Sequence, residues 1–151
     1  MKQIISYSFI LVLIDQIIKV VVSNMKNNIV IIKNFFSLTY IENTGAAFSI
    51  LESKRIFLII IGIGALYLIY KFLIKDKKLT PPETLIYSLL IGGIVGNLID
   101  RIIYGYVIDY LEFILFNHYM PIFNFADICI VIGTILFLFE TIKEDKKCKN
   151  M

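Results

Sequence analysis

The stretch GGIVGNLIDR at residues 92–101 decides the fold. It belongs to an apolar run over about 85–103, which is long enough to cross a lipid bilayer as a helix. Gly92 and Gly96 lie about one helical turn apart in this run, so a second helix can approach it closely. The stretch therefore predicts a membrane protein built from closely packed helices.

Polar residues share that helix. Asn97 precedes Asp100 and Arg101 by three and four positions, so the three side chains lie on one face. In the first apolar run, Asp15 and Lys19 are four residues apart and can form an ion pair. Ionisable groups at membrane depth are costly and usually face a bundle interior or a wet cavity. A structural ion pair and a functional role both stay open for Asp15 and Lys19.

The composition agrees with a membrane protein. Hydrophobic residues make up 58% of the 151-residue chain and the mean hydropathy is +0.81, whereas soluble domains are about 45–50% apolar. We predict a membrane all-α fold in which a four-transmembrane-helix bundle forms a single domain over residues 1–151. The predicted spans are about 4–22, 56–74, 85–103 and 125–142.

The positions of the basic residues predict the orientation. Nine lysines lie at the two ends of the chain and in the connection after the second span, which share one side of the membrane. Only four Lys or Arg residues lie in the first connection, about 23–55, and none in the third, about 104–124. The positive-inside rule then places both termini in the cytoplasm and these two connections outside.

The outer connections predict a small extracytoplasmic β element. Ile29–Ile41 is rich in β-branched and aromatic residues, which predicts one or two short strands, and Asn43–Gly45 predicts a turn. Tyr110–Phe123 is aromatic and apolar but interrupted by polar residues and a proline. We interpret it as a segment that lies at the membrane interface.

One aspartate lies in the third connection, about 104–124, and a second follows that connection. Asp109 follows the third span and Asp127 begins the fourth, so both are expected near the outer leaflet. Two carboxylates that meet can perform acid–base hydrolysis of an amide. Simpler roles also stay open, because Asn124 can cap the fourth helix and Asp127 suits the positive end of its dipole.

Five segments, in this order, resemble the motifs of the lipoprotein signal peptidases, the type II signal peptidases of the bacterial inner membrane. They are Asp15-Gln16 with Lys19, NTGAAFS at 43–49, Gly92-Gly93 with GNLIDR at 96–101, GYVIDY at 105–110, and FNFAD at 123–127 with Gly133. Tyr110 departs from the phenylalanine that is commoner in the family.

The resemblance implies a four-helix bundle with a β-cradle made by the first outer connection. It implies an aspartyl endopeptidase that cleaves a diacylglyceryl-prolipoprotein just before its lipidated cysteine, at the extracytoplasmic face of the inner membrane. It also implies membrane lipid as a partner and neither a cofactor nor a metal. We expect a monomer that binds no nucleic acid.

The resemblance also assigns roles to residues. Asp109 and Asp127 are the expected catalytic pair, and the sequence leaves open which of them is the base. The residues expected to position substrate and carboxylates are Asn43, Gly45, Asn97, Arg101 and Asn124. The expected supporting polar shell is Asp15, Lys19 and Asp100.

Two other functional classes remain as alternatives. A small proton-coupled membrane transporter would have polar groups along a path near the midplane and commonly internal repeats. The predicted polar groups gather toward one side, and the two halves show no repeat. A non-catalytic lipid-binding membrane module would need no pair of aspartates. His118 has no second His or Cys nearby and is interpreted as a surface residue.

Overall fold

Four long helices form the body of the protein in the computed structural model, which describes residues 1–25, 28–46, 50–116 and 118–149. They are α1 (Lys2–Ser23), α2 (Arg55–Leu68), α3 (Pro81–Ile103) and α4 (Phe125–Lys149), and α2 continues as one π-helical segment, η2 (Ile69–Ile74). α1, α3, α4 and the combined α2–η2 helix each have the length and apolar composition needed to cross a membrane. Among the described residues, these four helices agree with the predicted all-α membrane fold.

α3 is the central helix of the bundle. More than half of its apolar stretch is buried, whereas almost none of α2 is. Gly92 faces Leu11 of α1, and Gly93 faces Ala126 and Ile130 of α4. A side chain at either glycine would overlap the neighbouring helix. The small residues seen in the sequence are therefore what lets α1 and α4 pack against α3.

The start of α3 is fixed locally. Thr80 accepts a hydrogen bond from the backbone N–H of Glu83, and the Glu83 carboxylate accepts one from the backbone N–H of Thr80. This reciprocal capping box satisfies backbone donors that have no partner inside the helix. Pro81 occupies the first helical position, where its missing N–H costs nothing.

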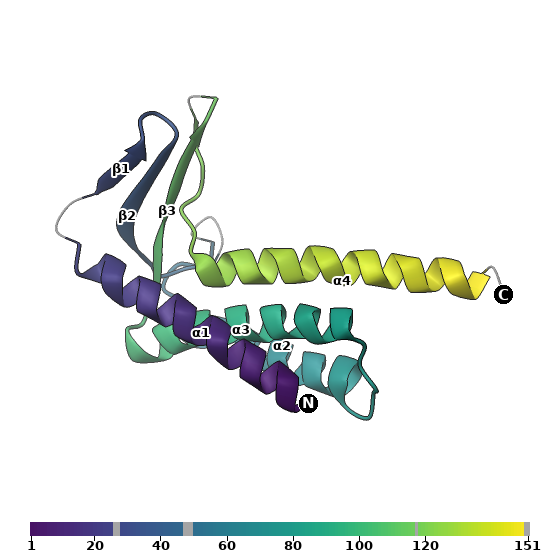
Figure 1. The fold of residues 1–151 in the computed structure, drawn as a ribbon. Helices are drawn as coiled ribbons and strands as arrows, with labels where there is room; N and C mark the ends of the chain where they lie inside the picture. Colours follow the sequence, from purple (N-terminus) through teal and green to yellow (C-terminus); the bar gives the residue numbers. More distant parts are fainter. Residues whose placement is uncertain (26–27, 47–49, 117, 150–151) are drawn as a thin grey trace.

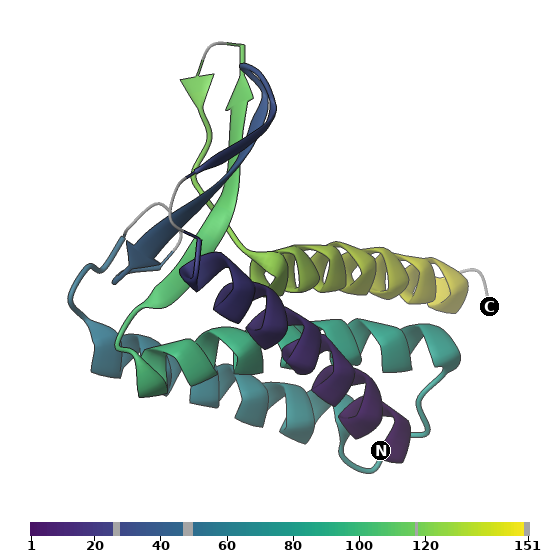
Figure 2. The same ribbon diagram turned by 60° about the vertical axis from the view of Figure 1, so that its left-hand side comes forward.

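An antiparallel four-stranded sheet stands at one end of the bundle. Its order is β1 (Ile29–Ile32), β2 (Phe36–Asn43), β3 (Val107–Leu115) and β4 (His118–Tyr119). Figures 1 and 2 show the sheet projecting away from the helices at the end where α1 finishes and α4 begins. The first residues of α1 and the last turns of α4 lie at the opposite end (Figure 1).

The sheet uses both long connections, which differs from the prediction. β1 and most of β2 fall in the predicted strand region Ile29–Ile41, but β2 continues to Asn43, where a turn was predicted. The sequence did not predict that the first part of Tyr110–Phe123 is a strand, β3. β3 alternates between two faces, and its Phe113 stacks on Phe36 of β2 at 4.6 Å between ring centroids. β3 is stabilised by this packing against β2, which cannot be seen in the sequence of either segment alone.

A small apolar cluster joins the sheet to the helices. Val22 of α1 packs with Ile108 and Tyr110 of β3, and all three are buried. Phe125, the first residue of α4, packs against the same cluster. The part of β3 that carries Asp109 is thus held against α1 and α4.

Candidate active site

Asp109 lies on β3 and is 3% exposed. Its Oδ2 accepts a hydrogen bond from Asn43 Nδ2 at 2.8 Å, and its Oδ1 accepts one from Asn124 Nδ2 at 2.6 Å. Burial raises the pKa of the Asp109 carboxyl to about 6; the Asn43 hydrogen bond opposes this, and the charge of Asp127 adds to it. The carboxyl is therefore ready to hold a proton at mildly acidic pH.

Asp127 lies in the first turn of α4. Its Oδ1 accepts a hydrogen bond from Asn97 Nδ2 at 2.7 Å, and its Oδ2 accepts one from the backbone N–H of Asn124 at 3.2 Å. Asn124 Oδ1 in turn accepts the backbone N–H of Asp127 at 3.0 Å. Asn124 therefore caps α4, and Asp127 lies at the positive end of the helix dipole, as the sequence allowed.

Asn124 also bridges the two aspartates. Its Nδ2 donates to Asp109 and to Asn97 Oδ1, at 2.6 and 3.2 Å, while Asn97 donates to Asp127. The side chain of Asn124 is fully buried. Two asparagines therefore join the strand that carries one carboxylate to the helix that carries the other.

Both aspartates line one cavity of about 660 Å³. Its polar walls are Asn43, Asn97 and Arg101, and its apolar walls come from β3, the segment after β4, and the first turns of α4. Arg101 Nη2 donates to the backbone carbonyl of Gly45 at 2.8 Å, which ties the loop after β2 to α3. Asn43, Asn97 and Arg101 thus form a polar floor for the cavity, and the apolar residues form its sides.

A buried ionic cluster lies behind this floor. Lys19 Nζ is 2.9 Å from Asp15 Oδ2, 2.8 Å from Asp100 Oδ2 and 3.1 Å from Asn97 Oδ1. Lys19, Asp15 and Asp100 are each at most 1% exposed. Gln16 Nε2 adds a hydrogen bond to Asp100 Oδ1 at 2.9 Å. Buried charges are tolerated when paired and hydrogen-bonded in this way.

The ionic cluster also holds the backbone beside each aspartate. Asp15 Oδ1 accepts the N–H of Ala126 at 3.0 Å, and Asp100 Oδ2 accepts the N–H of Ile108 at 3.2 Å. Ala126 and Ile108 are the residues immediately before Asp127 and Asp109. One cluster centred on Lys19 therefore positions both candidate catalytic segments.

A family model described as signal peptidase (SPase) II matches residues 7–143. The chain belongs to the signal peptidase II family. Several lipoprotein signal peptidases are similar in sequence to this chain over most of its length. That of Clostridium tetani is 46% identical over 119 residues, 78% of this chain and 76% of the relative. That of Clostridium acetobutylicum is 40% identical over 141 residues, 90% of this chain and 92% of the relative.

Two solved structures resemble the fold of this chain. A bacterial membrane enzyme solved by the in meso method at 2.3 Å resolution has a TM-score of 0.88 and 32% sequence identity, and covers 97% of this chain and 92% of its own. A second, at 1.9 Å, has a TM-score of 0.83 and 34% identity, and covers 95% and 94%. The chain is therefore a membrane peptidase, and its four helices and small sheet are those of a membrane enzyme.

Ten residues singled out in this signal peptidase II sequence come together around one cavity and the ionic cluster behind it. They are Asp15, Lys19, Asn43, Gly45, Asn97, Asp100, Arg101, Asp109, Asn124 and Asp127. Residues 47–49 of the NTGAAFS segment lie outside the described residues. The described part of the chain contains no group of three or more metal-ligating side chains.

One contact at this site was not predicted. The hydroxyl of Tyr110 accepts the backbone N–H of Phe125 at 3.1 Å. Tyr110 drew notice in the sequence only as a departure from the family's usual residue. A buried tyrosine hydroxyl usually finds a partner, but the sequence does not show which one.

Proposed function

We propose that the protein removes the signal peptide from diacylglyceryl-modified prolipoproteins by cleaving just before the lipidated cysteine. Membership of the signal peptidase II family supports the reaction, and relatives named lipoprotein signal peptidase support the substrate. One observation carries the chemistry: Asp109 and Asp127 line the same cavity and are joined through Asn124. Asp109 and Asp127 are the proposed catalytic dyad.

The two carboxyl groups differ in their surroundings. Asp109 is buried in the strand, and its pKa is raised to about 6, so we assign it the shared proton. Asp127 accepts two N–H hydrogen bonds at the positive end of α4, an arrangement that stabilises negative charge. Asp127 is therefore the proposed general base.

Hydrolysis then proceeds without a covalent intermediate. Asp127 takes a proton from water as the water oxygen attacks the scissile carbonyl carbon. The protonated Asp109 donates a hydrogen bond to the developing oxyanion. Collapse of the tetrahedral intermediate breaks the C–N bond, and the proton held by Asp127 passes to the leaving amine nitrogen. Asp109 ends with its proton and Asp127 ends ionised, so the dyad is restored.

The arrangement of the site suits a lipid-anchored substrate. The apolar side of the cavity includes Ile128, Val131 and Ile132 of α4, and Val131 and Ile132 are exposed on the membrane-length part of that helix. A substrate held by acyl chains in the outer leaflet reaches Asp109 and Asp127 from this side. The lysine distribution supports the orientation with both termini in the cytoplasm and the site at the extracytoplasmic face of the inner membrane. The proposed unit is a monomeric, single-domain peptidase.

The test is a comparison of matched precursors with and without diacylglycerol on the cysteine. The purified protein in detergent should cleave the lipidated precursor and process the other poorly, because remote binding energy positions the scissile bond. Equal initial rates would contradict the proposed substrate and favour a general membrane peptidase.

A further inference from the structure

The start of α4 is held by three different parts of the chain. The backbone N–H of Phe125 donates to Tyr110 Oη at 3.1 Å, and that of Ala126 donates to Asp15 Oδ1 at 3.0 Å. The N–H of Asp127 donates to Asn124 Oδ1 at 3.0 Å. The first N–H groups of a helix have no partner within it, and here each is taken by a defined acceptor. The position of Asp127 therefore depends on these three acceptors.

Tyr110 is the acceptor nearest in sequence to the other aspartate. It follows Asp109 on β3, so its side chain points to the opposite face of the strand. It is 3% exposed and packs against Val22 and Ile108. Burial raises the pKa of the Tyr110 hydroxyl, which stays protonated and neutral.

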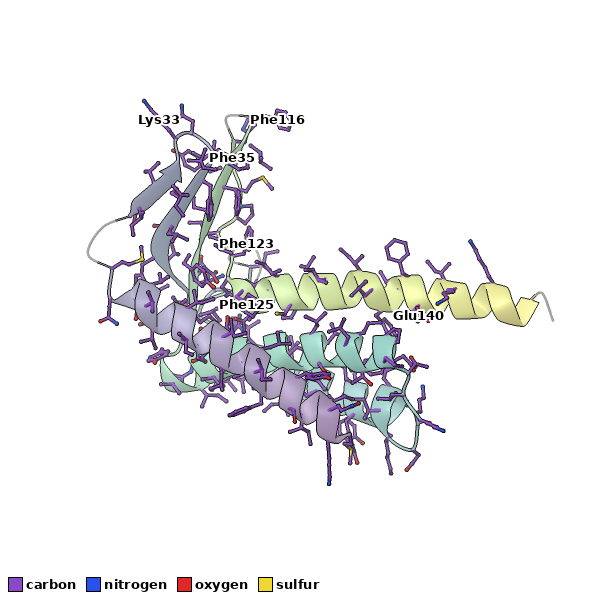
Figure 3. All side chains as sticks on the ribbon, viewed as in Figure 1. Lys33, Phe35, Phe116, Phe123, Phe125 and Glu140 are labelled. Atoms are coloured by element: carbon purple, nitrogen blue, oxygen red, sulfur yellow. The ribbon has the colours of Figure 1, made fainter. Side chains whose placement is uncertain are left out.

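The same stretch of β3 is paired by its backbone with the segment that enters α4. The N–H groups of Tyr110 and Leu111 both donate to the carbonyl of Phe123, at 3.1 and 2.8 Å. Figure 3 shows Phe123 and Phe125 at the junction between the sheet and α4. The Tyr110 hydroxyl extends this pairing by one more contact, onto the helix itself.

We propose that the Tyr110 hydroxyl is a positioning group for catalysis, which sets the separation between Asp109 and Asp127 by holding the first N–H of α4 to the strand that carries Asp109. This inference rests on the proposed function, because it assumes that these two aspartates react. Tyr110 does not line the cavity, so it acts on the dyad only through the backbone.

Loss of the hydroxyl has a specific physical consequence. Tyr110→Phe keeps the ring and its packing but leaves the N–H of Phe125 without its acceptor. The first turn of α4 then gains freedom, and Asp127 can move away from Asp109. A weaker repulsion between the two carboxylates lowers the pKa of Asp109 toward its ordinary value. A hydroxyl that served stability alone would leave the titration of the dyad unchanged.

The dyad titrates among other charges that the variant leaves in place. The ionisable groups around it are Asp15 and Lys19 of α1, Asp100 and Arg101 of α3, and Glu42 and Glu52, which line a second pocket beside Asp109. None of them bonds to the Tyr110 hydroxyl. A shift of the pH profile in Tyr110→Phe therefore reports the separation of the two aspartates.

The experiment measures kcat and KM on the lipidated precursor across pH, with thermal unfolding, for the wild type, Tyr110→Phe and the control Tyr104→Phe. Tyr104 is exposed and is the C-cap residue of α3, where only its backbone N–H bonds to the helix. For Tyr110→Phe, we expect kcat to fall roughly tenfold with KM nearly unchanged, since small displacements of reacting groups are costly. We also expect the basic limb of kcat/KM to move to lower pH. Tyr104→Phe should match the wild type in kcat, in KM, in the pH profile and in thermal unfolding.

The outcomes separate the inference from the function on which it rests. If the wild type does not cleave the lipidated precursor, the proposed function itself fails and the inference with it. If the wild type cleaves it but Tyr110→Phe keeps the wild-type basic limb, the positioning role is wrong. An unchanged basic limb contradicts the positioning role even if kcat or the unfolding temperature falls, because loss of a hydroxyl that only stabilises the fold would lower them too.

Discussion

Asp109 is the residue whose protonation controls the proposed reaction. The mechanism needs Asp109 protonated in the free enzyme, and burial raises its pKa to about 6. The protonated fraction falls as pH rises through this value, so kcat/KM should fall above about pH 6. A pH profile of kcat/KM on the lipidated precursor measures this limb. A profile that stays flat from pH 5 to about pH 8 would contradict the assignment of the proton to Asp109.

A substitution at Asn43 provides a second test of the role of Asp109. Its hydrogen bond to Asp109 favours the ionised carboxylate and so lowers the pKa. Asn43→Ala should therefore move the basic limb to higher pH. Thr44→Ala is the matched control, because Thr44 neighbours Asn43 and makes no described hydrogen bond to Asp109. An unmoved limb in Asn43→Ala would show that this bond does not tune the dyad.

At this scale the sequence predicted most of the site. Asp109 and Asp127 stood out because ionisable side chains next to apolar spans are rare. Asn43 and Asn124 were assigned to the site only by the resemblance to the lipoprotein signal peptidases. The division of roles between the aspartates was not predictable, because it depends on burial and on hydrogen bonds between distant segments. The Tyr110 contact was missed for the same reason, since an aromatic residue in an apolar segment gives no sign of its hydroxyl partner.

At the scale of elements, the close approach of α3 and α4 sets the depth of Asp127. A Cβ at Gly93 would overlap the carbonyl of Ala126 and lie 2.7 Å from Ile130 Cγ1. Gly93→Ala should push the first turn of α4 outward, which displaces Asp127. We expect activity to fall at least about tenfold and stability to fall by about 1–3 kcal/mol. Initial rates and thermal unfolding in detergent measure the two effects.

Gly64→Ala is the control for that substitution. Gly64 lies on α2, and a Cβ there meets no atom within 4 Å. Alanine is also the better helix former, by about 0.5–1 kcal/mol. Gly64→Ala should therefore keep full activity. Wild-type activity in Gly93→Ala would mean that α4 can shift without disturbing the dyad.

The helices were easier to predict than the sheet. Long apolar runs define the helices by themselves: the predicted spans 4–22, 85–103 and 125–142 lie within α1, α3 and α4, and 56–74 lies within α2 and η2 together. β3 has no such signal, because its strand character comes from pairing with β2 and from the stacking of Phe113 on Phe36. The aromatic and apolar pattern of Tyr110–Phe123 does not show a pairing partner, so only the tertiary structure shows that its first part is a strand.

At the scale of the whole molecule, the sheet lies at one end of the bundle, and the first residues of α1 and the last turns of α4 lie at the other (Figure 1). Phe116, at the tip of the sheet, is 94% exposed and points away from the helices (Figure 3). With Cys148 replaced by Ser, Phe116→Cys should react with a membrane-impermeant thiol reagent added to intact cells. Lys77→Cys, in the exposed turn after η2, should react only after the membrane is opened. The reverse pattern would invert the proposed orientation.

The catalytic dyad is tested most directly by the initial rate of cleavage of a diacylglyceryl-prolipoprotein by purified protein. Asp109→Asn and Asp127→Asn keep the size of each side chain and remove one acid–base partner. Each should lower the rate by roughly 10²–10⁴-fold, and the double variant should be little worse than either, because the pair acts as a unit. Near-normal turnover by either single variant, with its membrane insertion and thermal stability intact, would contradict the dyad.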